Sequence, residues 1–126
     1  AMSFLEMFRD WDDVEEFPAQ SVIFKEREPA DFMYVILSGE IELTLHGEPL
    51  DAEGEGGIIG EMATINSATR CATATALTQA RLARLDRDQF REIIADNGEF
   101  SLHVMAVLAN RLRAVDKFIS NKISAE

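Results

Sequence analysis

The glycines of this chain are gathered in one stretch, because six of the seven lie between residues 39 and 60. Short apolar runs stand around them. Residues 41–46 alternate apolar and polar side chains with the period of a half-buried strand, residues 32–37 are continuously apolar, and residues 72–76 alternate Ala and Thr. Short strands joined by glycine turns predict an antiparallel β-roll of the jelly-roll or double-stranded β-helix type.

The pattern changes to helical spacing after the roll. Asp86 and Gln89 have the spacing of a capping box, and apolar residues follow at intervals of three and four. Asn97 and Gly98 predict the end of this helix, and a longer helix is expected from about residue 99 to about residue 119. With a short amphipathic helix expected at the N-terminus, the chain is predicted to have an α+β fold.

Length and charge limit what this fold can do. A chain of 126 residues suits one domain, with the N-terminal helix at about 3–12, the roll at about 17–85 and two C-terminal helices at about 86–120. Its 12 basic and 23 acidic residues give a net charge of −11, which disfavours binding to nucleic acids and to anionic membranes. A single cysteine, Cys71, excludes an internal disulfide and favours the cytoplasm. We therefore expect no DNA binding by the chain itself and no membrane association.

The long C-terminal helix carries two apolar stripes. The first has the alternating spacing of three and four that is typical of a coiled-coil seam, and contains Leu102, Met105, Ala109, Leu112, Asp116 and Ile119. The second contains Val104, Leu108, Val115 and Phe118. A helix that is apolar on two sides needs two partners. The roll is one, and the other is either the rest of the same chain or a second copy of the helix in a homodimer.

The stretch from residue 56 to residue 74 holds the residues best suited to binding an anion. Three glycines, the last of them Gly60, precede residues 61–65, which can form one helical turn with free N–H groups. Arg70 follows, and it is the only Lys or Arg between residues 28 and 80, although nine acidic residues occupy positions 28 to 61. Such an arginine either pairs with a carboxylate or is reserved for an anionic ligand such as phosphate.

These residues resemble the phosphate-binding cassette of cyclic nucleotide-binding domains in the catabolite activator protein and protein kinase A regulatory subunit superfamily. That cassette reads approximately Phe-Gly-Glu-hydrophobic-Ala-Leu and then, after five residues, Arg-x-Ala. Here it stands as Ile-Gly-Glu-Met-Ala-Thr at 59–64 and Arg-Cys-Ala at 70–72. Residues 22–24, 33–41 and 85–90 resemble the family's early strands and the entry to its penultimate helix. The resemblance covers nearly the whole chain and implies a stand-alone domain, without a helix-turn-helix, in which a short cassette helix joins the roll.

The resemblance also implies a role for each site residue. Arg70 would bind the cyclic phosphate, Glu61 would accept the ribose 2′-hydroxyl proton, Gly60 would let the ligand approach the main chain, and the phosphate cradle would be completed by the amides of Met62, Ala63, Cys71 and Ala72. The ligand would be a cyclic nucleotide, with no metal and no cofactor. Its binding would draw the cassette helix inward and close the C-terminal helices over the base, as a signal to a downstream protein partner that is unknown.

Departures from the family pattern bear on which nucleotide is bound. Ile59 replaces the usual aromatic, Thr69 a common proline and Arg27 a loop glycine, but none of these changes removes a ligand-contacting group. Cys71 stands where a Thr or Ser often contacts guanine, and a thiol is a weak hydrogen-bonding group, so cAMP is favoured over cGMP. Asp116 aligns with a hydroxyl-bearing pair of the family's transcription factors. It either accepts a hydrogen bond from the adenine amino group or is a solvated residue in the seam.

Other functions fit the sequence less well. Cupin enzymes share a related roll but hold a metal with several histidines and a carboxylate. His46 and His103 stand apart from other ligands, so we expect neither a metal site nor an enzyme. Two hypotheses remain beside a ligand sensor, namely a dimeric interaction module with an empty pocket and a regulatory fragment of a larger transcription factor or channel. The intact Gly60, Glu61 and Arg70 favour the sensor.

Overall fold

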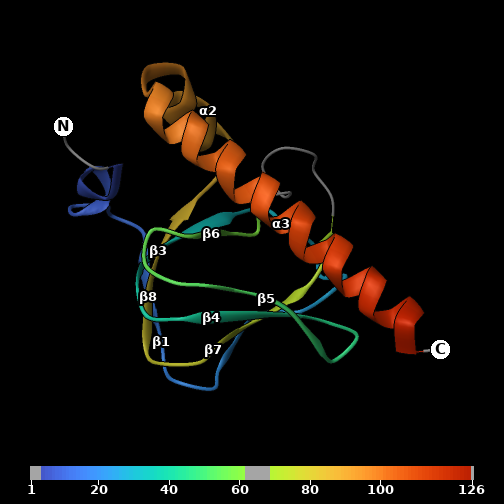
Figure 1. Cartoon of the computed structure of the whole chain (residues 1–126). Helices are drawn as coiled ribbons and strands as arrows, with labels where there is room; N and C mark the ends of the chain where they lie inside the picture. Colours follow the sequence, from blue (N-terminus) through green and yellow to red (C-terminus); the bar gives the residue numbers. More distant parts are fainter. Residues whose placement is uncertain (1–3, 62–68, 126) are drawn as a thin grey trace.

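The structure, a computed structural model, describes residues 4–61 and 69–125 as an antiparallel β-roll crossed by a long helix (Figure 1). The elements are η1 (Phe4–Phe8, a 3-10 helix), β1 (Val14–Phe17), β2 (Val22–Phe24), β3 (Met33–Ser38), β4 (Ile41–Leu45), β5 (Glu48–Glu53), β6 (Ile58–Ile59), β7 (Thr73–Ala76), β8 (Ala80–Leu85), α2 (Arg87–Asp96) and α3 (Gly98–Ala125). The strands form two antiparallel sheets, in the orders β1-β8-β3-β6 and β2-β7-β4-β5. The predicted α+β roll is confirmed.

The element boundaries differ from the predicted ones at both ends. The N-terminal helix is limited to η1, because the chain then extends along the first sheet, where the Trp11 indole N–H donates to the Arg84 carbonyl at 2.9 Å. The roll starts at Val14, which pairs with Ala83 in β8, rather than near residue 17. At the other end α3 continues to Ala125, since no Gly or Pro interrupts it. The predicted cassette helix lies largely outside the described residues.

Strand β3 is buried on both faces, and this explains its continuous apolar run. Met33 and Val35 belong to a cluster shared with the helices, which includes Phe100 of α3. Tyr34 and Ile36 point to the opposite side and belong to the cluster between the two sheets. Successive side chains of a strand face opposite sides, so a central strand with a core on each face has no polar positions to alternate.

The two C-terminal helices meet at a single residue. The capping box of α2 is present, because the Asp86 side chain accepts from the Gln89 N–H and the Gln89 side chain accepts from the Asp86 N–H. Asn97 then closes α2 by donating its N–H to the Ile93 carbonyl at 2.9 Å. Its side-chain oxygen also accepts from the Phe100 N–H at 2.9 Å in the first turn of α3. This shared cap sets the corner between the helices, and therefore the direction in which α3 crosses the roll.

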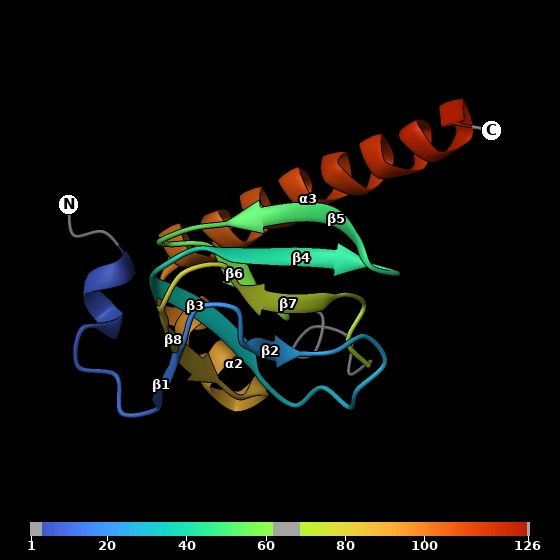
Figure 2. The ribbon, with the colours of Figure 1, turned by 90° about the horizontal axis from the view of Figure 1, so that it is seen from below.

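The two stripes of α3 lie in different environments. The inner face packs on the roll and begins earlier than predicted, with Phe100, Val104 and Val107 buried. The first stripe is exposed, at 67% for Leu102, 60% for Met105, 69% for Leu112 and 51% for Ile119, and its spacing continues to Ile123, which is 68% exposed. Figure 2 shows α3 running beside β5, with its C-terminal end projecting beyond the sheets. The described part of the chain therefore does not cover this stripe. It also contains no helix with the length and apolar character needed to cross a membrane.

Candidate functional site

Arg70 is positioned by backbone pairing with the turn that follows β2. The Arg70 N–H donates to the Glu28 carbonyl at 2.9 Å, and the Arg27 N–H donates to the Arg70 carbonyl at 2.8 Å. Next to this pair, Thr69 forms an isolated antiparallel bridge with Pro29. Arg27 adopts a φ of 70°, which allows the turn to reverse at this point. The segment before β7 is thus tied to the segment after β2, and the arginine backbone has a defined place at the end of the roll.

The Arg70 side chain points into the roll and is only 7% exposed. Its Nη1 donates to the Gly60 carbonyl at 3.3 Å, and its guanidinium carbon lies 4.2 Å from the centre of the Phe24 ring and 5.8 Å from that of Tyr34. Burial lowers the pKa of Arg70, but an arginine starts so high that it remains charged at neutral pH. Gly60 has a φ of 72°, and a Cβ there would lie 2.4 Å from Nη1. A larger residue at this position would have a strained backbone and would push the guanidinium out of its present place.

A cavity of about 390 Å³ opens beside Arg70. This volume falls within the range of about 300–1,000 Å³ that is common for small-molecule sites. Its charged lining residues are Glu61, Arg70 and Arg111, and most of its other lining is apolar, from Phe24, Leu43, Leu45, Leu50, Leu108, Leu112 and Val115. The cavity therefore suits a ligand with an anionic end and a largely apolar body, bound between the roll and α3.

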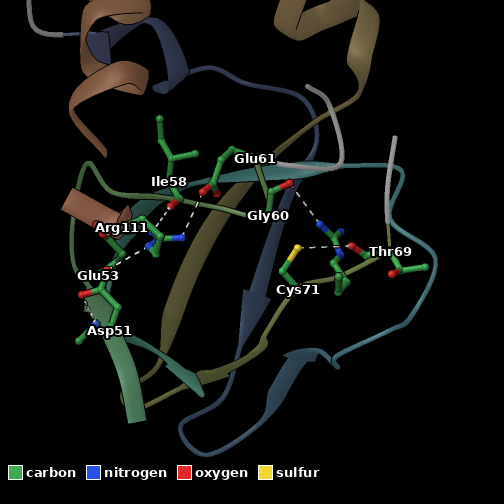
Figure 3. Close-up of polar contacts among 10 residues, drawn as sticks. Asp51, Glu53, Ile58, Gly60, Glu61, Thr69, Cys71 and Arg111 are labelled. Atoms are coloured by element: carbon green, nitrogen blue, oxygen red, sulfur yellow. Dashed lines mark hydrogen bonds and ion pairs between the residues drawn. The ribbon is translucent and has the colours of Figure 1, made fainter. Parts of the chain in front are cut away.

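Sequence reasoning missed Arg111, which connects α3 to the roll. Its guanidinium binds carboxylates of Asp51 at 3.0 Å, Glu53 at 3.2 Å and Glu61 at 3.2 Å, and donates to the Ile58 carbonyl at 3.0 Å. Figure 3 shows Arg111 lying between Glu61 on one side and Asp51 and Glu53 on the other. The arginine and the Glu61 side chain are 14% and 4% exposed. One cation therefore holds three carboxylates from different parts of the roll.

The Arg111 cluster is only partly neutralised, because three acidic groups share one guanidinium. Burial raises the pKa of Glu53, and the hydrogen bond and charge of Arg111 act in the opposite direction. A sequence signal for this cluster exists. Arg111 stands four residues after Val107 and four before Val115, so it interrupts the inner apolar face of a helix that lies on an acidic roll. A single cationic side chain on a buried helix face is expected to pair with carboxylates, because an unpaired buried charge is costly.

The predicted site residues fall into three groups. Five of them line the cavity together: Gly60, Glu61, Arg70, Cys71 and Ala72. Met62 and Ala63 lie outside the described residues. Asp116 is exposed and is not among the described residues that line the cavity, although its neighbour Val115 is. The structure thus brings together the described residues that were predicted to bind phosphate and ribose, whereas Asp116 lies outside the described lining.

Neither histidine is among the described residues that line the cavity. His46 is exposed at the turn after β4, where its Nδ1 lies 3.5 Å from a carboxylate oxygen of Glu26. His103 on α3 has its Nε2 2.6 Å from the carbonyl oxygen of Gly56. Within residues 4–61 and 69–125, no three His, Cys, Asp or Glu side chains are grouped so that they could hold a metal ion.

Comparison with known proteins points to one family. Residues 14–97 match the family described as the cyclic nucleotide-binding domain. The CRP-like cAMP-activated global transcriptional regulator of Mycobacterium tuberculosis is 32% identical over 113 residues, which cover 86% of this chain and 50% of the regulator. The chain therefore spans about half the length of this relative.

Solved structures show the same architecture. Catabolite activator protein from Thermus thermophilus superposes with a TM-score of 0.70 at 26% identity, over 86% of this chain and 53% of that chain. An EAL enzyme in its cAMP-bound form superposes with a TM-score of 0.60 at 32% identity, over 90% of this chain and 32% of the enzyme. The match to the enzyme therefore covers less than half of its length.

Proposed function

This chain belongs to the cyclic nucleotide-binding domain family, and we propose that it is a sensor that binds cAMP in the cavity between Arg70 and α3. The observation that carries the proposal is the burial of the Arg70 side chain and its place in the cavity. The side chain is buried, it donates to the Gly60 carbonyl, and it lines a cavity whose other walls are largely apolar. A buried guanidinium without a carboxylate at salt-bridge distance among the described residues is suited to a ligand anion.

Each part of cAMP would meet a matching group. The phosphate would bind Arg70 and the amides of Cys71 and Ala72, together with those of Met62 and Ala63. The ribose 2′-hydroxyl would donate to Glu61, whose carboxylate is held by Arg111 at 3.2 Å. The base would lie against the leucines of β4, β5 and α3 that line the cavity. Ionised acceptors form strong hydrogen bonds with hydroxyl donors, so Glu61 would also reject 2′-deoxy ligands.

Cys71 supports cAMP over cGMP. Its thiol lines the cavity and lies 3.9 Å from the Thr69 carbonyl, but sulfur is a weak donor and a weak acceptor. It would therefore contribute little to binding the polar edge of guanine. Two similar proteins are themselves linked to cAMP, since the Mycobacterium tuberculosis regulator is cAMP-activated and the EAL enzyme has a cAMP-bound form. We expect the sensor to have no catalytic residues of its own.

Calorimetric titration of the full chain with cAMP, cGMP and 5′-AMP tests the proposal. We expect saturable binding of cAMP, weaker binding of cGMP and little binding of 5′-AMP, whose phosphate carries a second negative charge into an acidic domain. Binding of none of the three would reject the sensor and favour an interaction module with an empty pocket. Tighter binding of cGMP would reject the role given to Cys71.

The proposed output is closure of α3 over the base. Leu108, Leu112 and Val115 of α3 line the cavity, and Leu112 is 69% exposed, so a base bound there would gain by drawing the helix inward. Asp116 would reach the adenine amino group only through such a movement. We expect cAMP to slow amide hydrogen exchange in residues 104–116 of α3, while η1 is unaffected. Binding without any change in the exchange of α3 would contradict the lid and leave the binding site in place.

We further propose that the exposed stripe of α3 packs against the same stripe of a second copy. Its alternating spacing of three and four extends past the predicted end to Ile123, so it provides about three heptads of coiled-coil seam. A seam of this spacing is complementary to itself, because the knobs of one helix fit the holes of an identical helix. Asp116 is the one charged residue in the seam and would weaken the pair, which is consistent with a dimer that can be regulated.

A charge placed in the seam is expected to prevent dimer formation. Met105→Lys and Ile119→Lys put cations at positions that are 60% and 51% exposed in the single chain, so the fold should persist while the dimer is lost. Sedimentation equilibrium would measure the change, and unfolding by urea would check the fold. Asn121→Lys, an exposed position outside the seam, is the matched control. A wild-type protein that stays monomeric at high concentration would reject the dimer.

A further inference from the structure

Arg70 lies on an aromatic surface that neither its hydrogen bonds nor the cassette motif explains. Its guanidinium carbon is 4.2 Å from the centre of the Phe24 ring and 5.8 Å from that of Tyr34, which stacks beside Phe24 with ring centres 6.2 Å apart and planes inclined by 23°. We propose that Phe24 is a positioning residue for Arg70, which holds the guanidinium in the orientation that the ligand phosphate requires. This inference rests on the proposed function, because the ligand is the one proposed above.

The remaining contacts of Arg70 do not define its orientation by themselves. The hydrogen bond from Nη1 to the Gly60 carbonyl is 3.3 Å long, at the weak end of the range for such bonds. It fixes one nitrogen but leaves the guanidinium plane free to rotate about that contact. An aromatic face attracts a cation and offers a flat surface to a planar group, so the ring of Phe24 supplies the missing constraint.

Phe24 is placed to contact the arginine and the glycine at once. It is the last residue of β2 and pairs with Ala74 of β7, whose small side chain leaves space inside the roll. Its Cε2 lies 3.4 Å from the position of a Cβ on Gly60, and it is 7% exposed and lines the cavity. A leucine at this position would keep the apolar burial but would offer no planar face to the guanidinium.

The charges around Arg70 explain why an orienting surface is needed. The carboxylates of Glu28, Asp31 and Glu61 all attract this cation. An unconstrained arginine would be drawn towards one of them, and the phosphate would then have to displace that carboxylate before it could bind. A guanidinium kept on the Phe24 ring remains directed at the cavity, so less ordering is required when the ligand arrives.

A double-mutant cycle separates positioning from packing. Phe24→Leu is expected to weaken cAMP binding by about 3- to 10-fold in the wild-type background, the range given by cation–π contacts. In the Arg70→Lys background the same change should cost less than about 2-fold, because the planar guanidinium on which the ring acts is gone. Tyr34→Phe, which keeps its ring, is the matched control and should leave affinity unchanged. Thermal unfolding of the ligand-free proteins reports any loss of fold.

A second measurement needs no ligand. The Nε–H resonance of Arg70 should be shifted by ring currents and restrained in its motion in the wild type, and both effects should weaken in Phe24→Leu, where only the more distant Tyr34 ring, 5.8 Å from the guanidinium carbon, remains. Equal losses of affinity in the two arginine backgrounds, or an unchanged Arg70 resonance in Phe24→Leu, would overturn the positioning role while the proposed function stands. A wild type that binds no cyclic nucleotide would overturn both, even with a restrained Arg70, since the orientation would then serve no phosphate.

Discussion

Replacement of Arg70 by alanine is expected to lower the affinity for cAMP by about 10- to 150-fold. A hydrogen bond to a charged group is worth about 1.5–3 kcal/mol, and each 1.4 kcal/mol changes an equilibrium constant about tenfold. The loss should be large here because Arg70 donates to the Gly60 carbonyl beside the cavity and is only 7% exposed. Water therefore cannot readily take over its hydrogen bond to the phosphate. Calorimetric titration of cAMP against the variant measures the effect.

Two control variants accompany this measurement. Arg70→Lys keeps the charge but loses the planar fork, and should fall between the wild type and Arg70→Ala. Arg113→Ala removes an exposed arginine of α3, whose Nη1 bonds to the Asn110 side chain at 2.7 Å, and should leave affinity unchanged. An affinity of Arg70→Ala within about twofold of the wild type would mean that the phosphate binds elsewhere, and the site assignment would be rejected.

Replacement of Arg111 by alanine is expected to cause the largest loss of stability. It leaves the carboxylates of Asp51, Glu53 and Glu61 close together without their shared cation, and breaking a buried ion pair from one side typically costs about 3–5 kcal/mol. Because Asp51 retains contact with water at 23% exposure, we expect the lower end, about 3 kcal/mol. For a domain of this size that corresponds to a drop in Tm of roughly 10 °C, measurable by calorimetry.

The loss of stability in Arg111→Ala should depend on pH in a direction set by Glu53. Burial raises the pKa of Glu53 above its ordinary value, so the folded state binds this proton more tightly than the unfolded state. The contribution of Glu53 to stability therefore falls as the pH rises through the raised pKa. Without Arg111, which acts to lower that pKa, the effect should grow. Urea unfolding should show a larger difference between variant and wild type at neutral pH than at mildly acidic pH.

A second substitution identifies the source of this pH dependence. Glu53→Gln in the Arg111→Ala background removes one of the crowded charges, so it should recover part of the stability and flatten the pH profile. Arg113→Ala again serves as the control for loss of an α3 arginine, and should change the free energy of unfolding very little. A deficit of equal size at both pH values would show that repulsion at Glu53 is not its cause.

Local patterns determined much of this protein in advance. The glycines around residues 39–60, the alternation in 41–46 and the capping box at Asp86 each involve residues close together in the chain, and the structure contains the turns, strands and helix start that they predict. The resemblance of residues 59–72 to the phosphate-binding cassette likewise implied that Gly60 and Arg70 belong to one site, and both line the cavity. Such features depend on the conformation of a few neighbouring residues, and this can be predicted directly from the local sequence.

Other features became visible only when distant segments were packed together. Arg111 and Glu61 are 50 residues apart, and the contact of Phe24 with Arg70 joins strand β2 to the segment before β7. The sequence alone could not decide which stripe of α3 faces the roll either, because both have helical spacing. These outcomes depend on the angle at which α3 leaves Asn97 and lies along β5. Helical spacing identifies an apolar face but not the surface on which that face packs. The amino-acid order therefore determined the strands, the helices and the phosphate-binding motif. Packing of distant segments decided which charged side chains come into contact.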